Sequence, residues 1–223
     1  MINTQLIVSS LPALLSAVLV TLKVAFSALL IGFCFGTVLA ILQLSKNSII
    51  RTLVTIFVTI IRGTPMLIQI VFLYYILSLT GLSLSPFLAA VWAIGINSSA
   101  YVSQIIKAGI QSVSIGQIEA AKTLGIKRRD LLRYIVLPQA FRVVLPALGN
   151  ESVTLIKDSS LASIIGVVEL YKQGQIIISH TYDALSIYCI VGALYLVMTT
   201  FLSLCVTRLE KWLNVHVKSF ESL

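Results

Sequence analysis

Charged side chains are scarce in this chain. Asp, Glu, Lys and Arg together make up 11% of its 223 residues, whereas 58% are hydrophobic, and the mean hydropathy is +1.01. A chain of this length cannot hide so many apolar side chains in one water-soluble core of ordinary size. The composition therefore excludes a soluble globular domain and predicts an integral membrane protein.

Cysteine is also rare. The three cysteines, Cys34, Cys189 and Cys205, are odd in number and lie inside apolar runs, which is typical of small hydrophobic side chains packed in helices. They indicate neither a disulfide framework nor a metal site. No Lys or Arg precedes Lys23, so the N-terminus lacks the basic region of a secretory signal peptide. We expect the first apolar segment to remain in the mature protein.

The residue patterns of enzymes are missing as well. The chain contains no G-x-x-x-x-G-K-[ST] motif to hold ATP phosphates and magnesium. It shows no plausible Ser/His/Asp or Cys/His pairing, since His180 lies in a polar connection and His216 in the tail. The net charge of +8 does not indicate nucleic acid, because the cations cluster in a few connections between apolar segments. We therefore expect no enzyme activity from this chain alone and no nucleic-acid partner.

Five segments are long enough to cross the hydrocarbon of a bilayer, which takes about 20 apolar residues. Backbone polar groups in lipid must be satisfied within the segment, so all five are predicted to be helices of one all-α transmembrane domain covering residues 1–223. The first apolar stretch is too long for one upright span. Residues 6–19 are therefore predicted to form an interfacial helix, with Lys23 reaching the surface. The predicted spans are 20–44, 53–79, 87–109, 143–166 and 185–207.

Cations follow the first, third and fifth predicted spans, and the loop 80–86 carries no charge. The positive-inside rule then places the N-terminus outside, the C-terminus inside, and the polar segment 112–141 in the cytoplasm. The connection 166–184 lies outside, with Lys172 as its one cation. The cations that set this orientation are Lys46, Arg51, Lys122, Lys127, Arg128, Arg129, Arg133, Arg208, Lys211 and Lys218.

Small residues recur every four positions in the first span, at Ala28, Gly32, Gly36 and Ala40. This stripe predicts close packing against another helix. No inverted repeat is visible, and five spans do not divide into two equal halves. A pore would then need a second copy of the chain or a related partner.

The segment 112–141 contains helix signals. Ser114 followed three residues later by Gln117 is a capping-box pattern, and Gly125 is a typical C-terminal stop, so residues 115–124 are predicted to be helical. A helix of about ten residues is too short to be stable alone in water, so it must pack against something. It either joins two spans along the membrane surface or docks onto a partner.

The same segment carries a recognisable signature: Glu119-Ala120-Ala121, three residues, Gly125, nine residues, then Ile135-Val136-Leu137-Pro138. It resembles the cytoplasmic loop of permease subunits of bacterial binding-protein-dependent ABC importers. In that family the short helix is a coupling helix, seated in a groove of the ATPase subunit. The resemblance implies an ATPase contact through Glu119, Ala120, Ala121 and Gly125.

Further motifs resemble the polar amino acid branch of that family, whose members take histidine, glutamine, glutamate, arginine, cystine or opines. The resemblance covers about residues 14–213. Gln104 stands where many relatives have Glu, and Lys107 where Arg is common, which puts an ion pair between these positions in doubt. The matching segments are Arg62-Gly63-Thr64-Pro65 with Gln69, Ala100-Tyr101, Gly116-Gln117, Leu137-Pro138-Gln139-Ala140, Leu145-Pro146 and Lys157-Asp158-Ser159-Ser160-Leu161.

The resemblance implies an ABC importer type I permease fold in the bacterial inner membrane. It also implies a second permease, identical or paralogous, two ATPase subunits that use ATP and magnesium, and an extracytoplasmic amino-acid-binding protein. Lys127, Arg128 and Arg129 either pair with acidic ATPase groups or simply follow the positive-inside rule. The implied function is ATP-driven import of a polar amino acid by alternating access. Two alternatives remain: a gradient-driven carrier or channel, and a membrane scaffold that transports nothing.

Two carboxylates lie within the fourth span. Glu151 and Asp158 are seven residues apart and therefore share one helical face. Acids within a membrane are costly and usually face a cavity or a partner. They are candidates to receive the cationic group of a basic or zwitterionic amino acid, while Asp158 alternatively pairs with Lys157 or Arg62. A carboxylate is expected to meet Arg62 or the end of a broken helix near Pro65. The candidate pathway residues are Arg62, Gln69, Asn97, Glu151, Asp158 and Ser159.

Overall fold

The computed structural model describes residues 2–81 and 84–213, and over these ranges it contains helices and no strands. The all-α prediction is confirmed. His216 and Lys218 lie outside the described residues. The elements are α1 (Thr4–Gln43), α2 (Ser48–Gly63), α3 (Met66–Leu79), α4 (Pro86–Gln111), α5 (Ile115–Thr123), α6 (Arg128–Asp130), the π-helical turn η1 (Leu131–Val136), α7 (Leu137–Asp158), the 3-10 segment η2 (Ser159–Ile165), α8 (Leu170–Thr181) and α9 (Ala184–Trp212).

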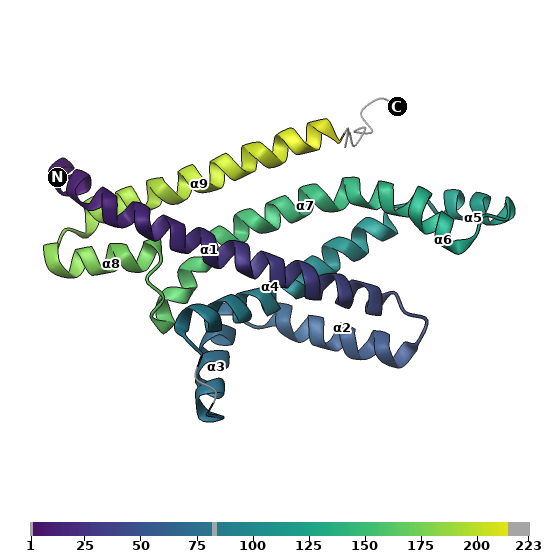
Figure 1. Ribbon diagram of the computed structural model, residues 1–223, viewed down its shortest axis with the longest axis horizontal. Helices are drawn as coiled ribbons and strands as arrows, with labels where there is room; N and C mark the ends of the chain where they lie inside the picture. Colours follow the sequence, from purple (N-terminus) through teal and green to yellow (C-terminus); the bar gives the residue numbers. More distant parts are fainter. Residues whose placement is uncertain (1, 82–83, 214–223) are drawn as a thin grey trace.

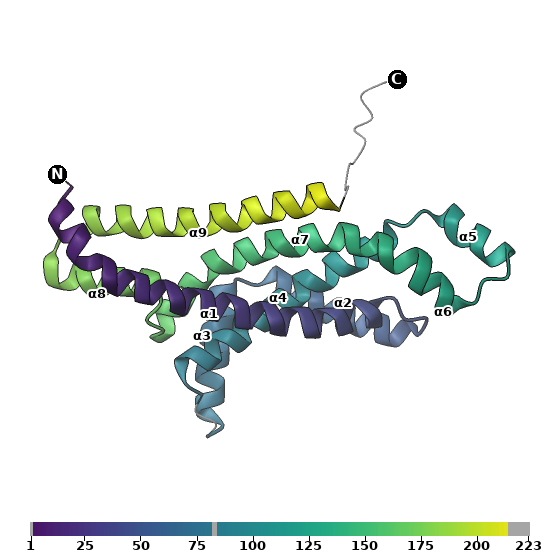
Figure 2. The same cartoon turned by 45° about the horizontal axis from the view of Figure 1, so that its top comes forward.

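The helices form an elongated bundle with two distinct ends (Figures 1 and 2). The α5 end carries α5, α6 and the turn between α1 and α2. The α8 end carries α8 and the beginning of α1. Four segments are long and apolar enough to cross a membrane, and the bent pair α2–α3 makes a possible fifth. The predicted spans 87–109 and 185–207 correspond to α4 and α9.

The first 40 helical residues form one continuous helix, so the prediction of a separate interfacial helix over residues 6–19 is wrong. The side chain of Asn3 caps α1 by accepting a hydrogen bond from the Leu6 amide at 3.1 Å. Leu14 is buried against Leu170 and Ile187, so α8 and α9 hold the N-terminal half of α1 in place. Because α1 is about 60 Å long at 1.5 Å per residue, it exceeds the roughly 30 Å of hydrocarbon in a bilayer.

The stripe of small residues on α1 faces α4, as predicted. Ala28, Gly32, Gly36 and Ala40 are all buried. A Cβ atom added at Gly36 would lie 2.8 Å from the carbonyl oxygen of Ser99, which is closer than ordinary van der Waals contact. The absence of side chains therefore lets the two helices approach backbone to backbone.

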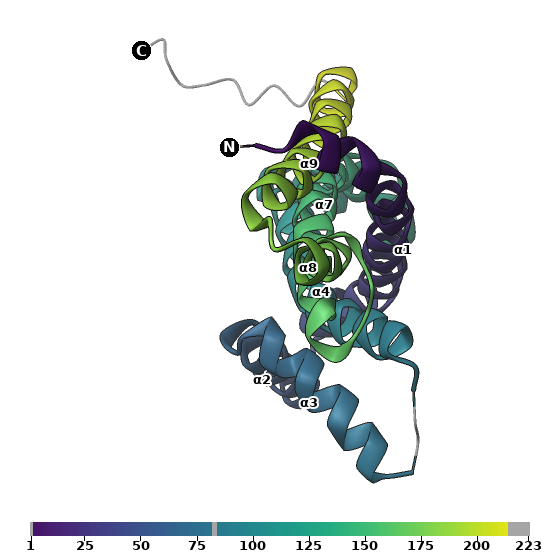
Figure 3. The same cartoon turned by 90° about the vertical axis from the view of Figure 1, so that its left-hand side faces the viewer.

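The predicted span 53–79 is not one straight helix. It breaks between Gly63 and Met66, where the helical path bends by 106°, and α3 projects away from the bundle (Figure 3). Thr64 is extended (ψ 146°), as expected of a residue before proline, and Pro65 has no amide proton to continue a helix.

The predicted span 143–166 begins too late. The structure shows a helical path from Arg128 through η1 and α7 to Ile165. Within η1 the Leu137 amide donates to the Leu132 carbonyl five residues back, and Pro138 directly after it cannot donate at all. Gly166, in a left-handed conformation (φ +94°), ends the path.

The connection 166–184 is mostly helical, and a buried carboxylate ties it to the bundle. Glu169 caps α8 by accepting hydrogen bonds from the amides of Tyr171 and Lys172 at 2.9 and 2.8 Å. It also accepts from the Tyr195 hydroxyl of α9 at 2.7 Å, while the Leu170 amide donates to the Thr21 hydroxyl of α1 at 3.1 Å. Burial raises the pKa of the Glu169 carboxyl, and its hydrogen bonds oppose that shift. This network fixes α8 to both α1 and α9.

The contact between α1 and α4 leads to a first prediction. Gly36→Ala should lower the thermal unfolding midpoint in detergent, because overpacking at such a contact costs about 1–3 kcal/mol. Gly192→Ala is the matched control: it also adds one methyl within a long helix, but no atom lies within 4 Å of that position. The control should match the wild type, and equal midpoints for both variants would contradict the packing argument.

Candidate functional site

A cavity of about 220 Å³ lies where the α2–α3 break meets α4 and α7. Both intramembrane carboxylates line it, as their seven-residue spacing predicted. Its walls also contain amide, hydroxyl and aromatic groups from three different elements. The lining residues are Thr64, Met66, Asn97, Tyr101, Glu151, Thr154 and Asp158.

The two carboxylates differ in how they are held. Glu151 accepts a hydrogen bond from the Ser98 hydroxyl of α4 at 2.8 Å, and this bond orients its carboxylate. Ser98 itself is completely buried beneath α1, where a Cβ atom at Gly32 would lie 2.7 Å from its hydroxyl oxygen. Asp158, at the last position of α7, is half-buried. The cavity thus presents two acidic groups two helical turns apart on α7.

Gln69 supports the cavity from outside its lining. Its amide nitrogen donates to the Ile61 carbonyl at 2.8 Å and to the Thr64 hydroxyl at 2.7 Å, across the break between α2 and α3. Its amide oxygen accepts from the Asn97 side chain at 3.0 Å. Gln69 therefore stabilises the break and positions Asn97.

Two other predicted pathway residues lie differently from expectation. Ser159 is fully buried and donates to the Ile156 carbonyl at 2.8 Å, so it does not line this cavity. Arg62 is not part of the lining; its guanidinium carbon lies 5.1 Å from the ring centroid of Tyr101, which does line the cavity. Arg62 thus lies behind the cavity wall and contacts the ring of Tyr101.

Sequence reasoning missed four lining residues: Thr64, Met66, Tyr101 and Thr154. Tyr101 lies one turn after Asn97, and Thr154 lies three residues after Glu151, so helical spacing from the chosen residues would have found both. Thr64 and Met66 flank Pro65 at the start of α3, and only the bend brings them to the cavity. The N-terminus of α3 has no side-chain cap.

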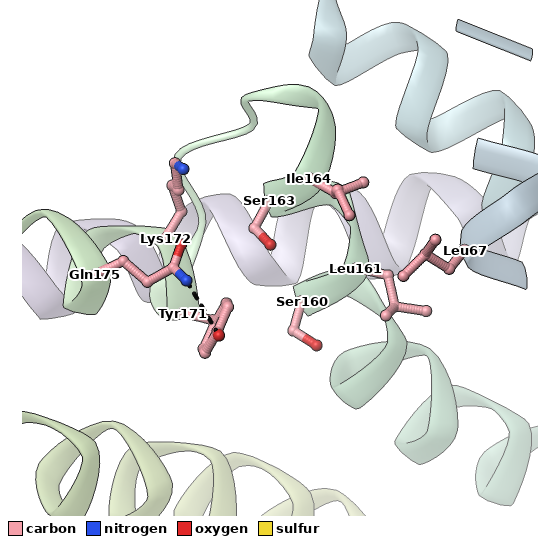
Figure 4. Close-up of a pocket in the computed structure, with 8 residues that line it drawn as sticks. All are labelled: Leu67, Ser160, Leu161, Ser163, Ile164, Tyr171, Lys172 and Gln175. Carbon is pink, nitrogen blue, oxygen red and sulfur yellow. Dashed lines mark hydrogen bonds between the residues drawn. The ribbon is translucent and has the colours of Figure 1, made fainter. Parts of the chain in front are cut away.

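A second cavity of about 520 Å³ follows toward the α8 end (Figure 4). The segment η2, which begins directly after Asp158, runs from the first cavity to the second and lines it. The Gln175 amide and the Tyr171 hydroxyl point toward one another and are 3.1 Å apart, while the Lys172 ammonium points away from the Tyr171 ring. The lining residues are Leu67, Ser160, Leu161, Ser163, Ile164, Tyr171, Lys172 and Gln175.

The predicted short helix of the polar segment is confirmed as α5, Ile115–Thr123. The capping box is not formed: Ser114 makes no side-chain cap, and Gln117 instead accepts from the Gln139 side chain at 2.7 Å. Gly125 adopts φ +72°, which allows the chain to turn as expected.

The four predicted contact residues of this segment do not share one surface. Glu119, Ala120 and Gly125 are exposed. Ala121 is only 3% exposed and packs with Val113 and Leu131 of its own chain. Ala121 therefore lies on a face of α5 that is occupied by its own chain, apart from the three exposed residues.

Gln104, one of the two positions at which an ion pair was in doubt, makes a neutral hydrogen bond instead. Gln104 on α4 donates from its amide nitrogen to the buried Gln43 at the end of α1, at 2.9 Å. This bond joins the two helices near the α5 end without any charge.

Comparisons with known proteins agree with one another. The family model described as the binding-protein-dependent transport system inner membrane component matches residues 32–218. The nopaline transport system permease protein NocM of Agrobacterium fabrum is 44% identical over 227 residues, covering 97% of this chain and 94% of NocM. The glutamine transport system permease protein GlnP of Escherichia coli is 36% identical over 208 residues, covering 92% of this chain and 95% of GlnP.

Two solved structures share the architecture. A chain of an amino acid ABC transporter crystallised with histidines is 39% identical, with a TM-score of 0.90 over 95% of this chain and 99% of that chain. A chain of the MetNI methionine ABC transporter in an inward-facing conformation is 20% identical, with a TM-score of 0.75 over 90% of this chain and 95% of that chain. The second likeness shows the fold alone.

The support from Gln69 leads to a second prediction. Gln69→Leu removes the hydrogen bonds that join Ile61, Thr64 and Asn97, so the bend between α2 and α3 should loosen, at a cost of about 1–3 kcal/mol. Spin labels at the exposed positions Ile56 and Phe72, in a cysteine-free background, should show a broadened distance distribution.

Gln175→Leu is the control for this variant, because Gln175 donates its hydrogen bond to Tyr171 within α8 and forms none across the α2–α3 break. It should leave the distance between α2 and α3 sharp. An unchanged distribution in Gln69→Leu would show that Pro65 alone sets the bend.

Proposed function

The chain belongs to the family of binding-protein-dependent transport system inner membrane components, and from that membership we propose how it carries its substrate. It is the transmembrane permease subunit of an ABC importer for polar amino acids. One observation supports a specific substrate site: the cavity in which Glu151 and Asp158 face the start of α3.

This cavity suits a ligand that carries both charges. Glu151 and Asp158 receive the cationic group, by charge-assisted hydrogen bonds that are stronger than neutral ones. The uncapped N-terminus of α3, beside Thr64 and Met66, offers free amides and the positive end of a helix dipole to a carboxylate. Arg62 adds a positive charge behind Tyr101. We infer a basic or zwitterionic amino acid, or a conjugate that retains both groups.

The family implies an ATPase and a binding protein as partners. We propose two ATPase subunits, which hold ATP and magnesium, docked at the α5 end, and a second permease copy or paralogue beside this chain. The binding protein delivers the amino acid at the α8 end. The orientation that follows from the positive-inside rule, with the α5 end in the cytoplasm of a bacterial cell, supports this arrangement.

The path of force follows from continuity of the backbone. ATP-driven closure of the ATPase subunits moves whatever is docked on them. Glu119, Ala120 and Gly125 are the exposed contact residues, and α5 is linked through α6 and η1 to α7. Since α7 carries Glu151 and Asp158, a displacement of α5 reaches the cavity along one segment of chain. The cavity then opens alternately to the two sides.

The substrate site leads to a third prediction. Glu151→Gln and Asp158→Asn should each raise the KM for ATP-driven uptake of a basic amino acid by about 10- to 100-fold, since a hydrogen bond to a charged group contributes about 1.5–3 kcal/mol. The measurement is uptake into proteoliposomes that contain the assembled transporter and its binding protein.

Glu210→Gln is the control for these variants, because Glu210 is a carboxylate in the last turn of α9, outside both cavities. It should leave KM unchanged. If the two cavity variants transported with the KM of the wild type, the cavity would not be the substrate site.

The coupling surface leads to a fourth prediction. Glu119→Arg should abolish stimulation of ATP turnover by the loaded binding protein, because it reverses a charge on the exposed face of α5. Gly125→Val should act similarly, because valine strongly disfavours φ +72°. Glu210→Arg reverses an acid in the last turn of α9, outside the segment that contains α5, and should keep stimulated turnover.

These variants also distinguish the alternatives. ATP turnover that persists unchanged in both Glu119→Arg and Gly125→Val would refute the coupling role of α5. Uptake that follows pH or membrane potential and survives ATP depletion would favour a gradient-driven carrier. A complex that moves no substrate at all would favour a scaffold.

A further inference from the structure

A third cavity, of about 460 Å³, lies at the α5 end and differs in chemistry from the two described above. Three cations and six apolar side chains line it, and no acidic side chain does. Its volume is in the range of specific small-molecule sites. The lining residues are Lys46, Ile110, Ile118, Lys122, Ile126, Arg128, Leu131, Leu132 and Val136.

The position of this basic cavity follows from the ends of two long helices. Ile110 belongs to the last turn of α4, and Lys46 follows the end of α1 at Gln43 by three residues. Both helices are candidate membrane spans. The cavity therefore lies at the ends of two candidate spanning helices, on the side that the positive-inside rule assigns to the cytoplasm.

The short helix α5 forms one of its walls. Ile118 and Lys122 are one helical turn apart and flank the buried Ala121, so this face of α5 is turned toward the bundle. Glu119 lies outside the lining. One face of α5 thus closes the basic cavity, while another carries the proposed ATPase contact.

The lining specifies an amphipathic anion. Lys46, Lys122 and Arg128 supply ammonium and guanidinium groups, which bind phosphate oxygens with strong charge-assisted hydrogen bonds. The isoleucine, leucine and valine side chains between them offer nothing to a free phosphate, but they suit the glycerol and the first methylenes of acyl chains. Basic pockets between spanning helices at the cytoplasmic face favour anionic headgroups.

We propose that the basic cavity binds an anionic phospholipid, with the headgroup phosphate held by Lys46, Lys122 and Arg128 and the acyl chains leaving along the apolar walls. Because the lipid contacts the end of α1, the end of α4 and the inner face of α5 at once, it fixes the position of α5 at the membrane surface. The site is separate from the substrate cavity, and its occupancy can be tested without any transport measurement.

The test is lipid binding by the purified, nucleotide-free complex of the permease with its ATPase, titrated in detergent with phosphatidylglycerol or phosphatidylcholine and read by native mass spectrometry. Each cation near an anionic lipid contributes about a fivefold gain in affinity, so the wild type should prefer phosphatidylglycerol about 100-fold. Lys46→Gln, Lys122→Gln and Arg128→Gln combined should remove this preference.

The matched control combines Lys127→Gln, Arg129→Gln and Arg133→Gln. It removes the same charge, two of its residues neighbour Arg128, and none of the three lines the basic cavity. The control should keep most of the preference for phosphatidylglycerol. Equal losses in both combined variants would overturn the proposal, because the preference would then come from general surface charge.

Two further arms fix the identity of the ligand. Leu132→Gln keeps every cation but disrupts an apolar wall, and should weaken phosphatidylglycerol binding about tenfold. Millimolar inorganic phosphate should not displace the lipid. Wild-type affinity in the combined cavity variant, or full displacement of the lipid by phosphate, would refute a lipid site.

Discussion

The close contact between α1 and α4 is the constraint on which the rest of the structure depends. Small residues on α1 allow its backbone to approach the segment 97–99 of α4, whose polar side chains reach in different directions. Ser98 bonds to Glu151 on α7, and Asn97 bonds to Gln69 at the α2–α3 break. Polar groups within a membrane need partners inside the protein. A wider gap at Gly32 or Gly36 would remove the support of α1 from segment 97–99 of α4, which makes both of these hydrogen bonds.

Helix α4, one partner in this contact, also connects the cavity region to the α5 end of the bundle. The cavity that contains Glu151 and Asp158 lies beside segment 97–99 of α4, and the short helix α5 follows the end of that helix after three residues. The return path through η1 and α7 carries the two carboxylates. The π-helical turn before Pro138 is a local departure from the α-helical pattern at the junction between these parts, and such turns often occur at functional positions.

Local spacing and hydropathy were enough to predict four features of the structure. These are the helical class, the spans within α4 and α9, the short helix α5, and the position of Glu151 and Asp158 on one face of α7. A broken helix near Pro65 was expected from the sequence, but the direction of α3 after the break, the inward position of Ala121 and the burial of Ser159 depend on tertiary packing. Local patterns do not encode them. Glu169 was missed for the same reason: an acid in a polar connection is common, and only the fold brings Thr21 and Tyr195 to its end of α8. The capping box at Ser114 failed because Gln117 has a competing partner in Gln139.

The central claim is that a polar amino acid binds between the start of α3 and the acidic face of α7 while α5 is seated on an ATPase. A cryo-electron microscopy structure of the assembled transporter with bound amino acid tests it most directly. The account predicts ligand density within hydrogen-bond distance of Glu151 and Asp158, with its carboxylate at the N-terminus of α3, and Glu119 in contact with the ATPase. Ligand density outside this cavity, or an α5 free of the ATPase, would contradict it.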